Sequence, residues 1–141
     1  MVIRCMDRRI GSRKFADLLD RFEICQEGEY DLVSVAGAAK DILSDQEGEQ
    51  EYLFKQIARS VKLHGTTRIF LFFHQECGAY GITDHSLEEM KQEQDIAEII
   101  GKIKSRFPDL TVYGYIMTGL NDPELDLKPT TPLNIGKKSL I

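Results

Sequence analysis

RIFLFFHQECG, residues 68–78, is the stretch of sequence that decides the fold. Every position from Ile69 to Phe73 is apolar, which is typical of a parallel strand covered on both faces by other elements. The polar residues that follow bring an imidazole and a thiol, His74 and Cys77, to the end of this strand. The segment therefore predicts a buried strand over 68–73 whose carboxyl end carries reactive side chains.

Segments with the patterns of strands and helices alternate on both sides of this stretch. Short apolar segments predict further strands over residues 2–6, 32–35 and 110–117. Apolar residues spaced three and four apart predict three amphipathic helices: one that starts near Ser12, one that stops near Gly65 and one over 86–106. We expect Ser12 and Ser86 to cap the first and third helices, and the acidic stretch 41–51 to be a solvated loop.

This alternation defines the expected fold class. Strands that alternate with helices imply right-handed βαβ crossovers, so the sequence predicts an α/β fold: a three-layer αβα arrangement with a mainly parallel central sheet of four to five strands. A chain of 141 residues fits a single domain spanning 1–141. Prolines cluster between 123 and 132, so we expect about 123–141 to be an extended C-terminal tail.

Composition excludes several classes of protein. A formal net charge of −5 argues against nucleic-acid binding, which draws on lysine and arginine. The longest apolar run falls far short of the ~20 residues of a membrane helix, and the N-terminus carries no secretory signal. Three cysteines, an odd number in a chain that needs no disulfide, favour a reducing compartment. We therefore expect a cytoplasmic protein that binds neither nucleic acid nor membrane.

Two clusters bring metal-binding side chains to the ends of predicted strands. Cys5 follows the first strand, and His74 and Cys77 follow the strand over 68–73. Carboxyl ends of parallel strands meet at one edge of a sheet, where ligands bind. Thiolate and imidazole are the ligands that zinc prefers, and a catalytic zinc keeps a fourth position for water, whose pKa it lowers to roughly 7. The sequence thus predicts a Zn²⁺ site, although each cysteine alone is equally typical of a small buried core residue.

A carboxylate and a guanidinium follow Cys5 closely. Asp7 and Arg9 are two residues apart, so their side chains leave an extended segment on the same side. A bidentate contact would orient the carboxylate and lower its pKa, and Asp7 would then accept a hydrogen bond from the metal's water. If the contact with Arg9 breaks, Asp7 is close enough to Cys5 to bind zinc itself. The alternative is an ordinary surface ion pair.

Cys-x-Asp-x-Arg at 5–9 and His-x-x-Cys-Gly at 74–78 together resemble the β-class carbonic anhydrases. The resemblance covers most of the chain, and Ala36-Gly37 is similar to part of another family motif. It implies a zinc enzyme that hydrates carbon dioxide reversibly to bicarbonate. Cys5, His74 and Cys77 would be its metal ligands and Asp7 and Arg9 its catalytic pair. The family also includes members in which the aspartate is a fourth ligand, and its members are dimers or multiples of dimers.

Two departures from the family keep other functions open. Ser34 and Val35 stand where the family usually has arginine and asparagine, and the chain starts at the first core strand, without the family's helical N-terminal arm. Both favour a non-catalytic zinc-binding module of the same fold. Relatives of this fold also hydrolyse carbon disulfide or carbonyl sulfide. A third alternative is a thiol redox protein that uses Cys5 and Cys77.

Overall fold

The apolar segment at 68–74 forms the central strand of a five-stranded sheet in the computed structural model, which describes residues 1–128. The strand order is β2-β1-β3-β4-β5. Strands β2, β1, β3 and β4 run parallel, and β5 pairs antiparallel with β4. The elements in chain order are β1 (Val2–Cys5), α1 (Ser12–Arg21), β2 (Leu32–Val35), the 3-10 helix η1 (Ala38–Leu43), α2 (Glu49–His64), β3 (Arg68–His74), α3 (His85–Arg106), β4 (Thr111–Thr118) and β5 (Asp126–Leu127).

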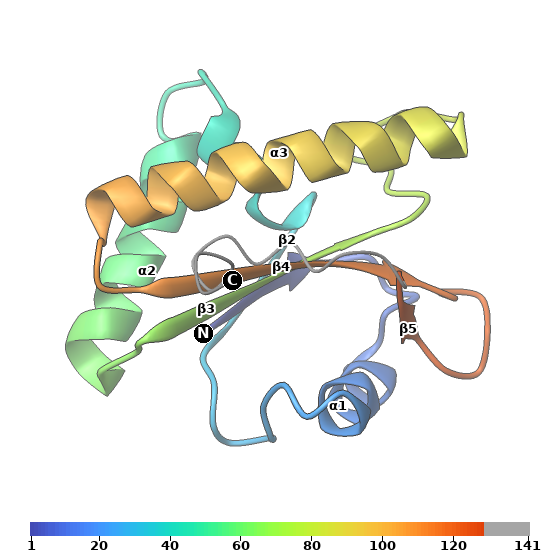
Figure 1. The fold of residues 1–141 in the computed structure, drawn as a ribbon, viewed down its shortest axis with the longest axis horizontal. Coiled ribbons are helices and arrows are strands. Elements are labelled where there is room, and N and C mark those ends of the chain that lie inside the picture. Colours follow the sequence, from blue (N-terminus) through green and yellow to red (C-terminus); the bar gives the residue numbers. More distant parts are fainter. Residues whose placement is uncertain (129–141) are drawn as a thin grey trace, which may run out of the picture.

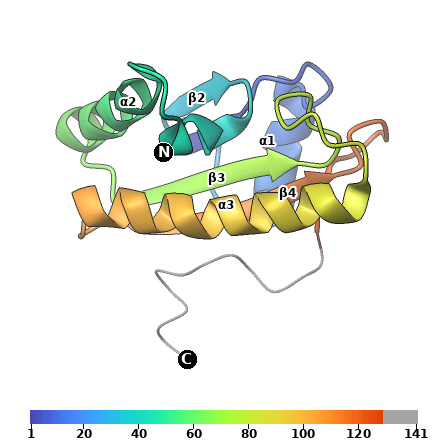
Figure 2. The ribbon, with the colours of Figure 1, turned by 90° about the horizontal axis from the view of Figure 1, so that it is seen from above.

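Helices cover both faces of the sheet. Figures 1 and 2 show α2, α3 and η1 on one face and α1 on the other. Side chains alternate along β3: Ile69 and Leu71 belong to the core under α2 and α3, whereas Phe72 belongs to the core under α1. There Phe15 of α1 packs edge-on against Phe72, with ring centroids 5.1 Å apart. The predicted three-layer α/β fold with a mainly parallel sheet is confirmed.

Several local predictions were wrong at the element ends. Ser12 is the first residue of α1, and Gly11, with φ at 64°, occupies the cap position. Asp84 caps α3 by accepting a hydrogen bond from the N–H of Leu87, so Ser86 lies inside the helix. Part of the expected solvated loop is η1, whose Ile42 is fully buried. Neither α1 nor η1 has a side-chain cap, and this is why cap residues in the sequence misplaced the boundaries.

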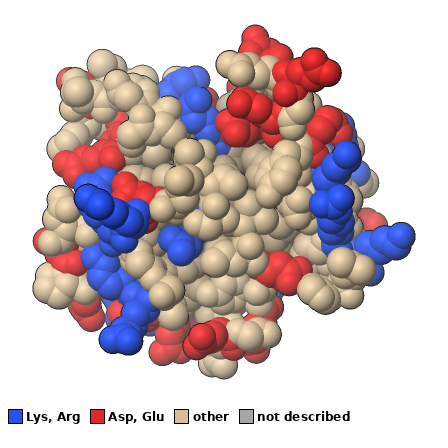
Figure 3. Space-filling view, turned by 180° about the vertical axis from the view of Figure 1, so that it is seen from behind, with Lys and Arg blue, Asp and Glu red and all other residues tan. Residues whose placement is uncertain are grey.

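Strand β2 is one edge of the sheet and presents apolar side chains to the surface. Leu32 on this edge is 46% exposed, and Met6, just after the neighbouring strand β1, is 63% exposed. The β2 side of the molecule faces the viewer in Figure 3, where mostly uncharged residues fill the centre and charged residues surround it. Within residues 1–128 no strand pairs with the outer side of β2, so its backbone groups there are open to a partner.

The C-terminal part of the described chain turns back along β4. Residues 126–127 form β5, and Lys128 next to it pairs with Glu89 and Glu93 of α3. The rest of the predicted tail, 129–141, lies outside the described residues. None of the helices within 1–128 has the length and hydropathy that a membrane span requires.

Candidate metal centre

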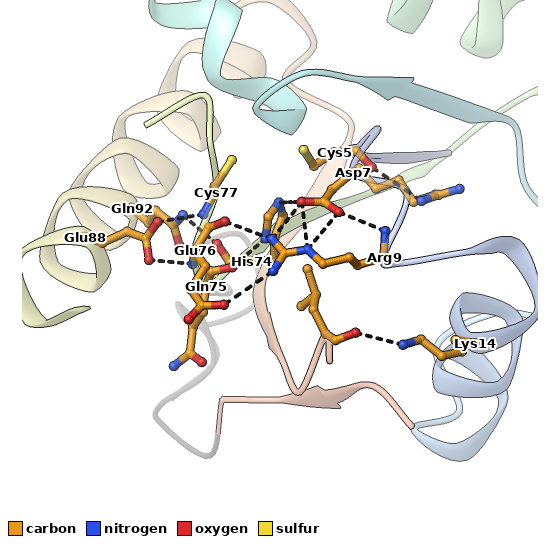
Figure 4. Close-up of polar contacts among 12 residues, drawn as sticks. Cys5, Asp7, Arg9, Lys14, His74, Gln75, Glu76, Cys77, Glu88 and Gln92 are labelled. Carbon is orange, nitrogen blue, oxygen red and sulfur yellow. Dashed lines mark hydrogen bonds and ion pairs between the residues drawn. The ribbon is translucent and has the colours of Figure 1, made fainter. Parts of the chain in front are cut away.

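The two predicted clusters meet at the carboxyl edge of the sheet. Cys5 ends β1 and His74 ends the neighbouring parallel strand β3, while Cys77 lies in the turn that follows. One ligand atom from each of these three residues lies within 4.8 Å of the others, and all three residues are buried. The two segments thus lie at one place in the structure, and Figure 4 shows the side chains converging.

His74 presents a free nitrogen in this cluster. Its Nδ1 lies 2.7 Å from the carbonyl oxygen of Gln75. A carbonyl only accepts hydrogen bonds, so Nδ1 carries the proton and Nε2 keeps its lone pair. Nε2 is buried, and among residues 1–128 no group makes a hydrogen bond of ordinary geometry to it. Buried polar atoms in folded proteins nearly always have a partner, so this lone pair suits a metal ligand.

Backbone groups beside the two sulfurs favour their thiolate forms. The backbone of Gly37 and of Asp7 lowers the pKa of Cys5, and the backbone of Ala79 and of Tyr80 acts in the same direction on the pKa of Cys77.

The two neighbouring sulfurs shift each other's pKa in opposite directions. The thiol of Cys77 donates to Cys5 and thereby lowers the pKa of Cys5, and the adjacent Cys5 thiolate raises the pKa of Cys77. Two thiolates side by side repel one another, so ionising both requires a cation between them. The sulfur pair therefore fits a metal cation.

Asp7 and Arg9 form the predicted bidentate pair beside the cluster. Arg9 Nη2 donates to Asp7 Oδ2 at 2.8 Å and Arg9 Nε donates to Oδ1 at 3.1 Å, while the Arg9 backbone N–H also donates to Oδ1. These contacts hold the pKa of Asp7 at about 2, so Asp7 is ionised at neutral pH. Asp7 Oδ2 lies 3.9 Å from His74 Nε2, which places the carboxylate against the candidate metal position.

Glu76 provides Arg9 with further partners. Its carbonyl oxygen accepts from Arg9 Nη2 at 3.0 Å, and its carboxylate lies 3.4 Å from Nη1. Glu76 has φ of 57°, which is unusual for a residue with a side chain and turns the chain sharply between His74 and Cys77. Both segments of the site are thus tied together through one guanidinium.

Three buried polar residues of α3 lie near the site, and the sequence reasoning missed all of them: Glu88 and Gln92 hydrogen-bond to the 74–77 turn, and Asp95 accepts from the hydroxyl of Tyr80. Glu88, Gln92 and Asp95 are each no more than 3% exposed. Their spacing of four and three residues continues the buried stripe of Ile96, Ile99 and Ile103 along the same helix. That spacing was the available signal, because polar residues on a buried helical stripe need partners inside the protein.

Two sulfurs and one imidazole nitrogen, all buried, form a donor set that suits zinc. The lone pair of His74 Nε2 and the two adjacent thiols agree with such an ion. The structure is thus a mainly parallel α/β fold with a candidate metal site at its strand ends.

Comparisons with known proteins agree with this class. The family model described as "Putative carbonic anhydrase" matches residues 1–123, so the chain belongs to that family. The fold is similar to that of a solved structure titled "The structure of the beta-carbonic anhydrase CcaA". The TM-score is 0.51 at 15% sequence identity, and the match covers 94% of this chain and 78% of the other. No curated protein matches in a search by sequence.

Proposed function

We propose that this chain is a zinc-dependent carbonic anhydrase that converts carbon dioxide and water reversibly to bicarbonate and a proton. Family membership supports the reaction class, and the buried cluster of two thiols and one imidazole supports the metal. The observation that carries the proposal is the convergence of two buried thiols and one buried imidazole, of which one ligand atom each lies within 4.8 Å of the others.

In this proposal Cys5, His74 and Cys77 hold the ion. Zinc in such a site supplies a hydroxide nucleophile at neutral pH. The carbonyl of Gln75 keeps the His74 proton on Nδ1 and so keeps Nε2 available as a ligand. The neighbouring backbone groups lower the pKa of Cys5 and oppose the rise in the pKa of Cys77, and so favour the thiolate forms that bind metal.

Asp7 is the proposed catalytic carboxylate, and Arg9 is its orienting partner. The side-chain hydrogen bonds from Arg9 Nε and Nη2, which we call the Arg9 fork, keep Asp7 ionised and fix both carboxylate oxygens. An ionised carboxylate accepts a hydrogen bond but donates none, so Asp7 is suited to orient the attacking water toward carbon dioxide. Should Arg9 release it, Asp7 is close enough to become a fourth ligand.

Stopped-flow hydration of carbon dioxide by zinc-loaded protein tests this function. We expect a rate above background that falls in the Asp7→Asn variant, since an amide turns a donor toward the position of the attacking water. Hydration at the background rate with zinc bound would reject catalysis and favour a non-catalytic zinc-binding module. Turnover of carbon disulfide or carbonyl sulfide without hydration would favour a hydrolase.

The active form that we propose is a homodimer of a single domain in the cytoplasm. The exposed Leu32 of the edge strand β2 and the exposed Met6 just after β1 support a partner surface, and the centre of this side is mostly uncharged (Figure 3). The three free cysteines support a reducing compartment. Sedimentation analysis tests the assembly: Leu32→Asp should convert the dimer to a monomer, and a wild-type monomer would contradict it.

A further inference from the structure

One carboxylate of α3 binds the turn that carries the candidate metal ligands. Glu88 lies near the start of this helix and is 1% exposed. Its Oε1 accepts from the backbone N–H of Glu76 at 2.8 Å, and its Oε2 accepts from the backbone N–H of Cys77 at the same distance. Figure 4 shows the carboxylate reaching both N–H groups from the side of α3. Each oxygen of Glu88 thus holds one of two consecutive peptide groups.

The next turn of α3 holds the other end of the same segment. Gln92 Nε2 donates to the carbonyl oxygen of His74 at 2.8 Å, and Gln92 is also 1% exposed. Gln92 is four residues after Glu88, so both side chains leave the helix on the same face. Two side chains of one rigid helix therefore fix the backbone at the last residue of β3 and the backbone at Cys77.

Local backbone preference alone does not produce this turn. Glu76 adopts φ of 57°, a conformation that a residue with a side chain adopts rarely. The turn also directs two neighbouring N–H groups inward, where each needs an acceptor. Glu88 supplies both acceptors, and an ionised carboxylate suits them because charged hydrogen bonds are stronger than neutral ones. The position of Cys77 Sγ relative to His74 Nε2 thus depends on a residue outside the donor set.

We propose that Glu88, supported by Gln92, is a positioning residue that holds the 74–77 turn in the shape required for metal binding and thereby sets the metal affinity. The inference rests on the zinc-binding part of the proposed function and is independent of hydration activity. Residues that orient metal ligands typically contribute 10- to 100-fold to affinity. Glu88 and Gln92 contact backbone rather than ligand side chains, so they act through the conformation of the turn.

The test compares Glu88→Gln with wild-type protein by competition between the protein and a zinc chelator. Glutamine keeps the volume, but only one of its two terminal atoms accepts a hydrogen bond, so its NH₂ faces an N–H. We expect the zinc Kd to rise by roughly 10- to 100-fold. Glu98→Gln is the matched control, because Glu98 is an exposed residue of the same helix, and its Kd should stay within about twofold of wild type.

Cobalt spectra and apo-protein stability distinguish positioning from a general effect on folding. Cobalt-loaded Glu88→Gln should show altered ligand-field and sulfur-to-cobalt charge-transfer bands, and the Cys77 amide should exchange faster in the apo form. A folded Glu88→Gln protein with wild-type zinc affinity and cobalt spectrum would overturn the proposal, even if its apo stability were lower. If wild-type protein binds no zinc, the proposed function itself fails.

A second variant decides the matter if Glu88→Gln does not fold. Gln92→Met removes the donor to the His74 carbonyl while filling similar space. We expect its zinc Kd to rise about 3- to 10-fold, as loss of one buried hydrogen bond implies. A folded Gln92→Met protein with wild-type affinity would contradict the account.

Discussion

Arg9→Met is expected to let Asp7 turn onto the metal and close the site. Arg9 holds Asp7 through side-chain hydrogen bonds from two nitrogens, Nη2 at 2.8 Å and Nε at 3.1 and 3.3 Å from the carboxylate oxygens, and the Arg9 backbone N–H remains in any variant. Charged hydrogen bonds contribute about 1.5–3 kcal/mol each, less when partly solvated as this pair is. We therefore assign about 2–3 kcal/mol to the Arg9 fork. This free energy favours the present position of Asp7 over the position on the metal by roughly 30- to 150-fold.

Binding of azide to the cobalt-loaded protein measures this change. Asp7 Oδ2 is already 3.9 Å from His74 Nε2, so a small rotation brings the carboxylate to the metal. Azide must then displace Asp7 from the metal. The affinity of the protein for azide should therefore fall by up to the whole preference given above, roughly 30- to 150-fold. Arg9→Lys, which keeps the charge but not the fork, should show a smaller loss.

The double variant Asp7→Asn/Arg9→Met provides the control. An amide is a poorer metal ligand than a carboxylate, so azide affinity should recover in the double variant. Wild-type azide affinity in Arg9→Met would refute the reasoning. Weak binding that persists in the double variant would also refute it, because the loss would then have a cause other than Asp7.

Three further predictions concern positions around and outside the site. Gly37→Ala should lower the free energy of unfolding by about 1–2 kcal/mol and weaken zinc binding, measured by denaturation and chelator competition, because φ is 75° and the new Cβ lies 3.2 Å from Ala79 Cβ. Cys5→Ser should lose the bound zinc and Cys25→Ser should retain it, because Cys5 belongs to the cluster and Cys25 does not; metal analysis of both variants checks this. His64 and Ser60 lower the pKa of Asp31, so folding favours its ionised form. The stability that Asp31 contributes is therefore present above its unfolded pKa of ~3.9 and is lost as the pH falls through its pKa in the folded protein. Asp31→Asn should therefore reduce the loss of stability between neutral and acid pH by up to ~1 kcal/mol, measured by denaturation at each pH.

Much of the fold was predictable because its central strand has a simple pattern. The run after Arg68 is apolar at every position, and both of its faces are covered by helices. Helix ends were less predictable, since Gly11 and Gly48 occupy cap positions without any side-chain hydrogen bond. The 3-10 helix at 38–43 was missed because so short a helix shows no periodicity in sequence.

The candidate site was predictable where it depends on side chains at strand ends. Cys5 and His74 meet because neighbouring parallel strands end together, a consequence of topology. The support from Glu88 was not predictable in the same way. Its partners are backbone N–H groups, which every residue has, so no complementary residue type marks them in the sequence.

Zinc content and carbon dioxide hydration measured on the same sample test the central claim most directly. The account predicts about one zinc ion per chain and hydration above background from pH ~7 to 9, where a metal's water has ionised. Zinc-loaded protein that hydrates carbon dioxide only at the background rate across that range would contradict it.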